Sequence, residues 1–306
     1  MGIPDFRVFP DPYISLAEDR EKGRRLAEYG HAHNFESTVA YYYAMTPEVP
    51  PDLAARYTRY IQTGIDRGRA LLGAMAPPES TADQGAGRSL LEIGCGTGGL
   101  LIDARENYSH VVGIDIALRW LVVAQIRLRE HGADVPLVCC CAEYLPFLDE
   151  QFDRVTAGDV LEHSVDQQRL LAESARVLKP GGTLFLVTQN RFTLRLEPCV
   201  RVWGVGFLPR PWMNAYVRWA RRIPYHRVHM VSYVELRRLL RKAGFQAVRV
   251  MLPDISTGER RLMTGWEKIQ IAVYNGLKRL PIIRMILYLG GPAFWALGHK
   301  GPTRKS

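Results

Sequence analysis

The 306-residue chain lacks the features that mark several protein classes. It has only five cysteines, three of them consecutive, and no pair has the spacing of a zinc site, so reduced and buried thiols are expected. No run of about 18 uninterrupted apolar residues is present, so no membrane-spanning helix is expected. The first eleven residues contain no basic segment followed by an apolar run, and no secretory signal is expected. Repeats and low-complexity tracts are absent too, and the sequence predicts a globular cytoplasmic protein.

Charge is distributed unevenly along the chain. Residues 1–190 hold 18 Lys and Arg against 26 Asp and Glu, whereas residues 191–306 hold 22 against 5, a balance of +17. Such an asymmetry suggests that the C-terminal third meets an anionic partner. A membrane surface, a phosphorylated substrate and a nucleic acid are the candidates, and a merely solvated basic face is the alternative. A peripheral association with the inner membrane face therefore stays open.

A cluster of glycines follows a short apolar run at residues 89–93. The run predicts a buried strand, and the residues after Gly99 begin a helical pattern. Glycines allow a tight turn and a close approach of a ligand, and the helix start offers free N–H groups. The spacing Gly94-x-Gly96-x-x-Gly99 also fits a dinucleotide-binding loop. Glu92 beside the turn favours a cationic ligand over a diphosphate, because like charges repel.

Two further apolar runs predict the next strands. Residues 111–115 end in Asp115, close to the offset of about 20 residues at which an acid binds ribose hydroxyls. A helix N-cap is the structural alternative for Asp115, but Ile116 separates it from the helix predicted over 118–130. Residues 135–141 end in three cysteines, which suit a buried parallel strand and receive no redox role.

The motifs that follow carry a family resemblance. Phe152-Asp153-Arg154-Val155 precedes Leu161-Glu162-His163, and Leu178-Lys179-Pro180-Gly181-Gly182 precedes an apolar run at 183–188. Together with Glu-x-Gly-x-Gly-x-Gly at 92–98, these segments resemble the motifs of class I S-adenosylmethionine-dependent methyltransferases. The similarity is to the small-molecule type, such as quinone-precursor and methyltransferase-11-like enzymes. It covers residues 88–190 closely and resumes at 232–252.

The resemblance implies a fold and a division of the chain. The fold is α/β and Rossmann-like: a seven-stranded, mostly parallel, doubly wound sheet with an antiparallel last strand, expected at 293–299. Residues 1–87 are then an N-terminal helical lid region, with one helix over 52–75, and 88–190 are the cofactor-binding core. A basic aromatic insertion spans 191–231. The remainder of the sheet lies in 232–306, with a helical insertion at 256–291 that is expected to pack on the sheet.

The resemblance also implies S-adenosyl-L-methionine as cofactor and a small-molecule or lipid-linked acceptor, with O-methylation favoured. The predicted cofactor-binding residues lie at or just beyond strand ends. They are Glu92, Gly94, Cys95, Gly96, Gly98, Asp115, Ile116, Ala142, Glu143 and Gly158. The predicted catalytic residues are His163, as general base, and Asp159.

Asp159, Glu162 and His163 have the spacing of one helix turn. The pattern is similar to the Glu-x-x-Glu-His of quinone-precursor O-methyltransferases, which is associated with a divalent cation. Asp replaces Glu at the first position, and a structural use of Glu162 and His163 at a helix start is preferred. No metal is therefore predicted.

The insertion at 191–231 admits two interpretations. If Pro211 begins a helix, Trp212, Tyr216 and Trp219 share one face, with Arg218, Arg221 and Arg222 largely off it. An aromatic face with a cationic flank suits a membrane interface. It equally suits a substrate lid that buries its aromatic face on the core.

Three other functions are weighed against methyl transfer to a small molecule. A dinucleotide-dependent oxidoreductase would use the same glycines, but Glu92 argues against it. A non-catalytic Rossmann-like module at a membrane would keep the motifs without binding cofactor. A nucleic-acid methyltransferase is not expected, because Gly158-Asp159-Val160-Leu161 stands where many amino-directed enzymes of that class carry an Asn-Pro-Pro-Tyr-type segment.

Overall fold

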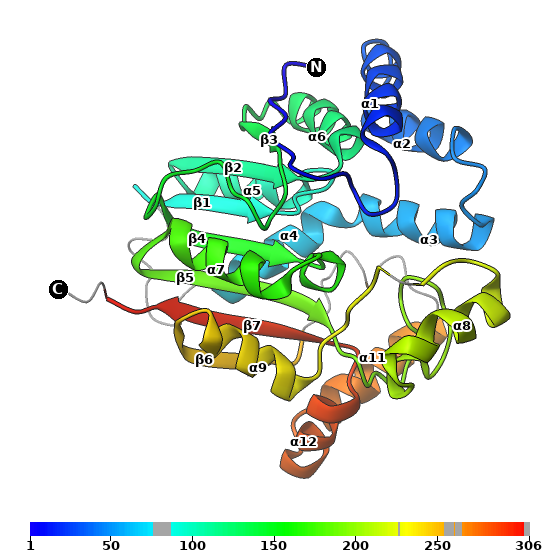
Figure 1. Cartoon of the computed structure of the whole chain (residues 1–306), viewed down its shortest axis with the longest axis vertical. Helices are drawn as coiled ribbons and strands as arrows, with labels where there is room; N and C mark the ends of the chain where they lie inside the picture. Colours follow the sequence, from blue (N-terminus) through cyan, green and yellow to red (C-terminus); the bar gives the residue numbers. More distant parts are fainter. Residues whose placement is uncertain (76–86, 226, 254–259, 261–264, 303–306) are drawn as a thin grey trace.

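The computed structural model describes residues 1–75, 87–225, 227–253, 260 and 265–302. A central seven-stranded sheet carries helices on both faces (Figure 1), with the strand order β3-β2-β1-β4-β5-β7-β6. Strands β1 to β5 are parallel, and β7 is antiparallel to both of its neighbours. The predicted fold is confirmed, including the antiparallel last strand. The strands are β1 Ser89–Ile93, β2 His110–Asp115, β3 Leu137–Cys139, β4 Phe152–Gly158, β5 Leu178–Gln189, β6 Phe245–Met251 and β7 Ala293–Lys300.

Apolar side chains on both faces of the strands explain the layering. On one face, α7 (Gln167–Val177) and α9 (Tyr233–Lys242) pack on residues of β1, β4 and β5. On the other face, α5 (Gly99–Asn107) and α6 (Leu118–Glu130) pack on a second core that includes Phe185 and Trp295. Because helices cover both faces of the sheet, residues on both sides of each strand are buried, and the strand sequences are nearly continuous apolar runs. Helices α1 (Leu16–Gly30) and α2 (Phe35–Ala44) form an outer layer on α6.

The single helix predicted over residues 52–75 is wrong in one respect. Two helices, α3 (Pro51–Gln62) and α4 (Gly64–Met75), meet at Thr63. The hydroxyl of Thr63 donates to the carbonyl of Arg59, which helps to end α3. Gly64 then lies so close to Gly99 that a Cβ on Gly99 would come within 2.5 Å of its backbone. This close approach brings α4 against the glycine turn after β1.

The insertion at 191–231 builds a small core of its own. It contains η2 (Val205–Phe207) and α8 (Arg210–Arg221), and α8 begins at the predicted Pro211 within one residue. Met213 and Val217 are the buried residues of α8, whereas Trp212 and Trp219 are 66% and 81% exposed. A lid that buries its aromatic face on the core is therefore not what the structure contains. The aliphatic face points inward and the tryptophans point outward.

The second helical insertion also differs from expectation. It contains α11 (Gly265–Leu277) and α12 (Pro281–Gly290), while 254–259 and 261–264 lie outside the described residues. Trp266, Ile269 and Val273, which were expected to pack on the sheet, are all more than half exposed, and no residue of α12 is buried. The predicted packing on the sheet is therefore wrong for this stripe of α11, whereas Tyr288 of α12 packs on the sheet core and its hydroxyl donates to the carbonyl of Val250 in β6 at 3.1 Å. Among the residues that the structure describes, no helix is long and hydrophobic enough to cross a bilayer.

Candidate active site

Two adjoining hollows lie at the carboxyl ends of the parallel strands. The first, termed the strand-end cavity, has a volume of about 390 Å³ and is bounded by the ends of β1, β2 and β4. The second, termed the tyrosine cavity, measures about 720 Å³ and extends under α3 and the insertion. Gly94, Gly158 and His163 line both, so the two hollows meet there. Open α/β sheets bind their ligands at this edge.

The turn after β1 is held by Asp115 from the end of β2. One carboxylate oxygen of Asp115 accepts the N–H of Gly96 at 2.8 Å, and the other accepts the N–H of Ala117 at 2.8 Å. Gly96 has φ +50°, and a Cβ built on it would meet no protein atom within 4 Å. The space beside Gly96 is therefore open to a ligand. Each oxygen of Asp115 keeps a further lone pair for a ligand hydroxyl.

Glu92 places a buried carboxyl oxygen near the end of β1. Its Oε2 atom is buried and has no hydrogen-bond partner among the described residues. Burial and the nearby carboxylate of Asp115 raise the pKa of Glu92 well above its usual range, and the cation of Arg67 opposes this rise. A buried carboxylate without a partner costs stability, and a cationic group beside it would offset that cost.

The other predicted cofactor-binding residues separate into two groups. Ile116, Ala142 and Glu143 line the strand-end cavity, and Cys95 lines the tyrosine cavity. The Oε1 atom of Glu143 accepts the N–H of Val165 at 2.8 Å, which fixes the loop before α7. Gly98 lines neither cavity, because it serves as the left-handed N-cap of α5.

His163 faces both cavities at their junction. Its Nδ1 atom lies 2.9 Å from the hydroxyl of Tyr13, and its Nε2 atom lies 4.0 Å from the sulfur of Cys199. Burial lowers the pKa of His163 from its ordinary value, against the opposing effect of Asp159. The imidazole is therefore neutral at pH 7, the form in which it accepts a proton.

Contrary to what the spacing suggested, Asp159 does not share a helix turn with Glu162 and His163. Only Leu161–His163 form a 3₁₀ turn, η1, and Asp159 precedes it with φ +54°. The carboxylate of Asp159 accepts the Tyr60 hydroxyl at 2.7 Å and the Gln189 side-chain amide at 2.9 Å.

The carboxyl of Glu162 accepts the hydroxyl of Thr188 at 2.9 Å, and burial raises its pKa to about 8. The suggestion that Glu162 and His163 start a helix is also wrong. Helix α7 begins at Gln167 and is capped by Asp166. Across the described ranges, no three His, Cys, Asp or Glu side chains converge as a metal site would require.

Comparison with known proteins now adds a second line of evidence. Residues 91–186 match the methyltransferase domain family. The ubiquinone/menaquinone biosynthesis C-methyltransferase UbiE of Bordetella parapertussis is 33% identical over 202 residues, which cover 65% of this chain and 69% of the relative. The chain belongs to the class I S-adenosylmethionine-dependent methyltransferases. This membership removes the oxidoreductase interpretation.

Other relatives match over a shorter part of their length. The ubiquinone biosynthesis O-methyltransferase of Idiomarina loihiensis is 38% identical over 117 residues, 37% of this chain and 47% of the relative. The chain thus spans about half to three fifths of the length of the O-methyltransferases that it resembles. Phosphoethanolamine N-methyltransferase 2 of Haemonchus contortus superposes with a TM-score of 0.52 at 18% identity, covering 81% of this chain and 58% of that one. This likeness concerns the fold alone.

The site's residues fit the family's cofactor. S-Adenosylmethionine carries an ammonium and a sulfonium, and the bare oxygen of Glu92 is the kind of group that a cation requires. Its ribose has two vicinal hydroxyls, which the carboxylate of Asp115 can accept. The open space at Gly96 leaves room for the ligand beside the turn.

Two residues of this site escaped the sequence-based prediction. The Arg67 guanidinium lies 3.4 Å from the centre of the Tyr60 ring, and both line the tyrosine cavity near Glu92. Arg67 also donates to the hydroxyl of Thr63 at 2.6 Å. Their spacing of seven residues, about two helical turns, was the only signal in the sequence. It does not reveal which side of the helix faces a ligand.

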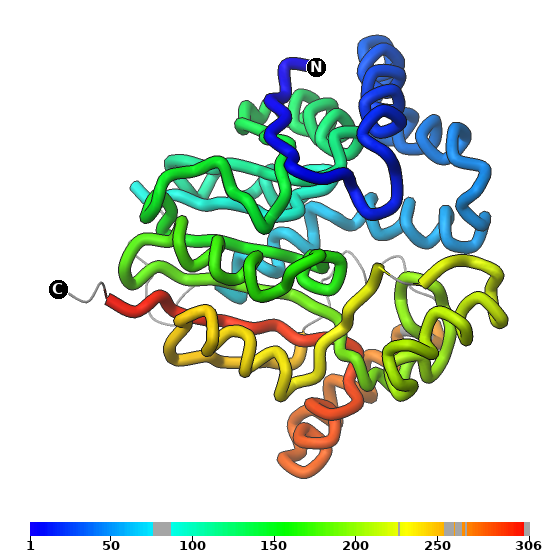
Figure 2. The backbone as a smooth tube through the Cα atoms, viewed as in Figure 1, coloured from blue at the N-terminus to red at the C-terminus, as the bar shows by residue number. Residues whose placement is uncertain are grey.

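The N-terminal segment contributes to the wall of the strand-end cavity. Figure 2 shows it passing β3, looping below α6 and turning up into α1. Near its start, the N–H of Cys139 donates to the carbonyl of Pro4, and the N–H of Phe6 donates to the carbonyl of Cys139. The segment therefore adds to the free edge of β3, and its next residues, Asp11 to Tyr13, line the cavity.

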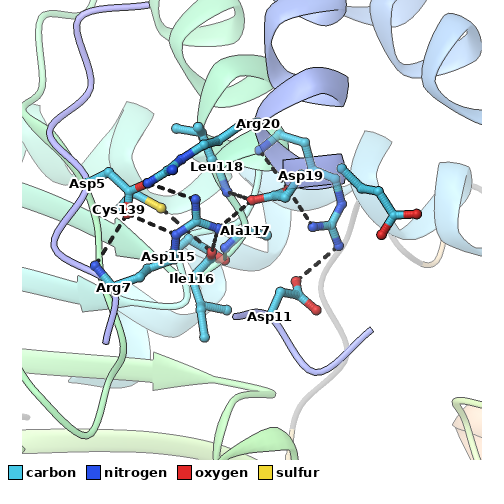
Figure 3. A network of polar contacts seen from close by, with 12 residues as sticks. Asp5, Arg7, Asp11, Asp19, Arg20, Asp115, Ile116, Ala117, Leu118 and Cys139 are labelled. Atoms are coloured by element: carbon cyan, nitrogen blue, oxygen red, sulfur yellow. Dashed lines mark hydrogen bonds and ion pairs between the residues drawn. The ribbon is translucent and has the colours of Figure 1, made fainter. Parts of the chain in front are cut away.

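A buried ion network holds this segment in place (Figure 3). Arg7 donates to Asp19 at 2.6 Å and to the carbonyl of Ile116 at 3.0 Å. Asp19 in turn accepts Arg119 at 2.7 Å and the N–H of Leu118 at 2.9 Å, so it caps α6 from another helix. The network ties the N-terminal segment to the loop that follows Asp115. A lid function for residues 1–87 stays a prediction.

Proposed function

We propose that this chain transfers a methyl group from S-adenosylmethionine to a hydroxyl of an amphipathic small molecule with an aromatic head. One observation carries the proposal: the tyrosine cavity opens onto Gly94, Gly158 and His163, where it meets the strand-end cavity. Its walls combine tyrosines with aliphatic side chains such as Leu53 and Val228. The names of relatives in ubiquinone and menaquinone biosynthesis support an acceptor of quinone-precursor type.

The cofactor side of the proposal assigns roles to four groups. Asp115 accepts the ribose hydroxyls, and Ile116, Ala142 and Glu143 surround the adenine. Glu92 faces the cationic part of the cofactor. Arg67 is placed to form an ion pair with the carboxylate of the cofactor's methionine moiety. The bound cofactor supplies a methyl group already activated on a sulfonium, so the protein mainly has to position the acceptor.

A hydroxyl acceptor needs a base, and His163 is the group placed to act as one. When Nδ1–H donates to the oxygen of Tyr13, Nε2, which lies 4.0 Å from the sulfur of Cys199, carries the lone pair that takes the acceptor's proton. The lowered pKa keeps the imidazole neutral for this task. Asp159 serves as a positioning residue, because Tyr60 and Gln189 already occupy its carboxylate. The base favours O-methylation over C-methylation.

The proposal extends to domains and location. Residues 1–87 form the lid, 88–190 bind the cofactor, and 191–231 wall the acceptor cavity through Val200 and Val228. The remainder, 232–306, completes the sheet and carries the helical insertion at 256–291. An acceptor with a lipid tail is reached most directly by a cytoplasmic protein that sits peripherally on the inner membrane face.

The deciding experiment separates cofactor binding from transfer. Calorimetry should give binding of S-adenosylmethionine and S-adenosylhomocysteine but not of NAD(H). Labelled S-adenosylmethionine, offered with phenolic acceptors that bear short and long alkyl tails, should then give a methyl ether identified by mass spectrometry. Leu53→Trp should reduce turnover of the long-tailed acceptor by filling the aliphatic wall of the tyrosine cavity. It should leave cofactor affinity unchanged, because Leu53 does not line the strand-end cavity in which the ribose and adenine are placed. Cofactor binding without any methylated product would favour the non-catalytic module instead.

A further inference from the structure

An unusually apolar outer surface covers the end of the molecule that carries the two insertions. Its side chains are each about half exposed or more, and none of α12 is buried. This region, termed the α8–α12 surface, comprises Leu194, Trp203, Phe207, Trp212, Trp219, Trp266, Ile269, Val273, Ile282, Met285, Ile286 and Leu289. Large exposed apolar patches of this kind mark interaction sites.

A chain of hydrogen bonds makes this surface continuous from α12 to α8. The N–H of Leu194 donates to the carbonyl of Gly290 at the end of α12. The indole of Trp203 donates to the carbonyl of Leu194 at 3.1 Å, and the hydroxyl of Tyr216 on α8 donates to the carbonyl of Trp203 at 3.0 Å. Tyr216 stacks on Trp219, with ring centres 6.2 Å apart. Figure 1 shows α8, α11 and α12 gathered at one end of the molecule.

Positive charge accompanies the apolar side chains. Arg195, Arg201, Arg218 and Arg222 are exposed and form no ion pair with other described residues, and the same holds for Arg284 within α12. Over 191–225 and 227–253, the acidic residues are Glu197, which is buried, and Glu235, which lies 3.5 Å from Arg210. Helices α8 and α12 contain no acidic residue, and α11 contains one, Glu267. The surface is thus apolar and predominantly cationic.

We propose that the α8–α12 surface docks the protein on an anionic lipid bilayer without spanning it. Amphipathic helices with tryptophans and basic residues lie in the interface plane, with their apolar side chains among the headgroups and acyl chains. Charge decides between this occupant and a second copy of the chain. A two-fold interface would bring two copies of this cationic surface together, whereas anionic headgroups attract it.

The docking surface and the tyrosine cavity share one segment. Residues 200–228 contribute Val200, Ile223 and Val228 to the cavity wall, while Trp203 and Trp219 of the same segment face outward. Docking would therefore bring the cavity wall next to the lipid. The docking itself does not depend on the proposed methyl transfer, and it is tested on the protein without cofactor.

Vesicle flotation tests the proposal. The full chain should float with phosphatidylglycerol–phosphatidylcholine vesicles and not with phosphatidylcholine alone, and raising salt from about 0.1 M to about 1 M should release it. Arg218→Glu with Arg222→Glu should weaken binding by about tenfold or more. Ile282→Ser with Ile286→Ser, and separately Trp212→Ser with Trp219→Ser, should each weaken it through lost insertion, with unchanged circular dichroism.

Matched controls keep the result specific to this surface. Arg241→Glu with Lys242→Glu makes the same charge change at the far end of α9, and Leu148→Ser removes a side chain that is 77% exposed before β4. Both should bind vesicles like the parent. Equal loss in these controls, or no binding by the parent, overturns the proposal. Light scattering that finds a dimer abolished by the Trp212/Trp219 variant, with no vesicle binding, assigns the surface to a second copy instead.

Discussion

The hydroxyl of Tyr13 lies 2.9 Å from Nδ1 of His163, although 150 positions separate the two residues. Tyr13 follows the N-terminal segment that Arg7, Asp11 and Asp19 fasten to α6. His163 belongs to η1, just beyond β4. The proposed base is therefore in contact with a residue of the N-terminal segment that lines the cavity.

Removal of the proposed base should affect transfer and not cofactor binding. His163→Asn should lower kcat by about 10²- to 10⁴-fold, the usual contribution of a general base, with an unchanged Kd for S-adenosylmethionine. Tyr13→Phe keeps the ring but loses the hydrogen bond, so a smaller loss is expected. The rate of methyl ether formation and calorimetric titration measure the two effects.

The pH profile of the reaction distinguishes a general base from a residue with a merely structural role at position 163. Since burial lowers the pKa of His163, the base is lost only when the pH falls below 6.5, the ordinary value. The acid limb of kcat/KM for the parent should therefore lie below pH 6.5 and vanish in His163→Asn. An acid limb that persists in the variant would assign it to another group.

Asp115 should carry a large part of the cofactor affinity. Asp115→Ala should weaken S-adenosylmethionine binding by about 1.5–3 kcal/mol, the scale for hydrogen bonds to a charged group. It also releases the N–H of Gly96, which Asp115 holds at 2.8 Å. Calorimetry measures the loss, and Asp134→Ala, at an exposed position, is the control. Equal affinity in both variants would mean that the ribose lies elsewhere.

Glu92 should lower the stability of the cofactor-free protein and raise its affinity for the cofactor. Its pKa is raised in the folded protein, so the stabilisation present at low pH is lost as the pH rises through the raised value. Glu92→Gln should thus raise the Tm of the cofactor-free protein at pH 8 by about 2 °C or more, with a smaller effect at pH 5. The same change should weaken cofactor binding by about 10- to 100-fold. Thermal melts and calorimetry are sufficient, and a loss of both stability and affinity would contradict the argument.

The ion network should be a major source of stability for the N-terminal segment. Asp19→Ala leaves Arg7 and Arg119 buried without their shared partner and uncaps α6. Such a break costs about 3–5 kcal/mol of the free energy of unfolding. Urea denaturation measures it, and Glu28→Ala, which breaks an exposed pair with Arg24, should change little. Similar losses in the two variants would show that the network has no special role.

The fold and half of the site could be read from local patterns. The turn at 94–99 needs residues that accept positive φ, and Asp115 ends an apolar run at a fixed distance from it. Strand runs that are apolar on both faces predict a sheet covered by helices, and the order of strands and helices then predicts a parallel arrangement. These features depend on neighbours in the chain, so the sequence by itself determined them.

Only the tertiary structure decided the partners and the outward faces. Tyr13 and Arg67 reach the site from the N-terminal segment and from α4. The local sequence around them does not indicate which residues they contact in the folded chain. Helix α8 has apolar residues on two sides, Met213 and Val217 on one and Trp212 and Trp219 on the other. Periodicity defines each face but not which of them the core covers, because that choice depends on the volume and shape of the residues packed against it. The aliphatic side fits the small core around Val205 and Tyr225, which leaves the tryptophans outside.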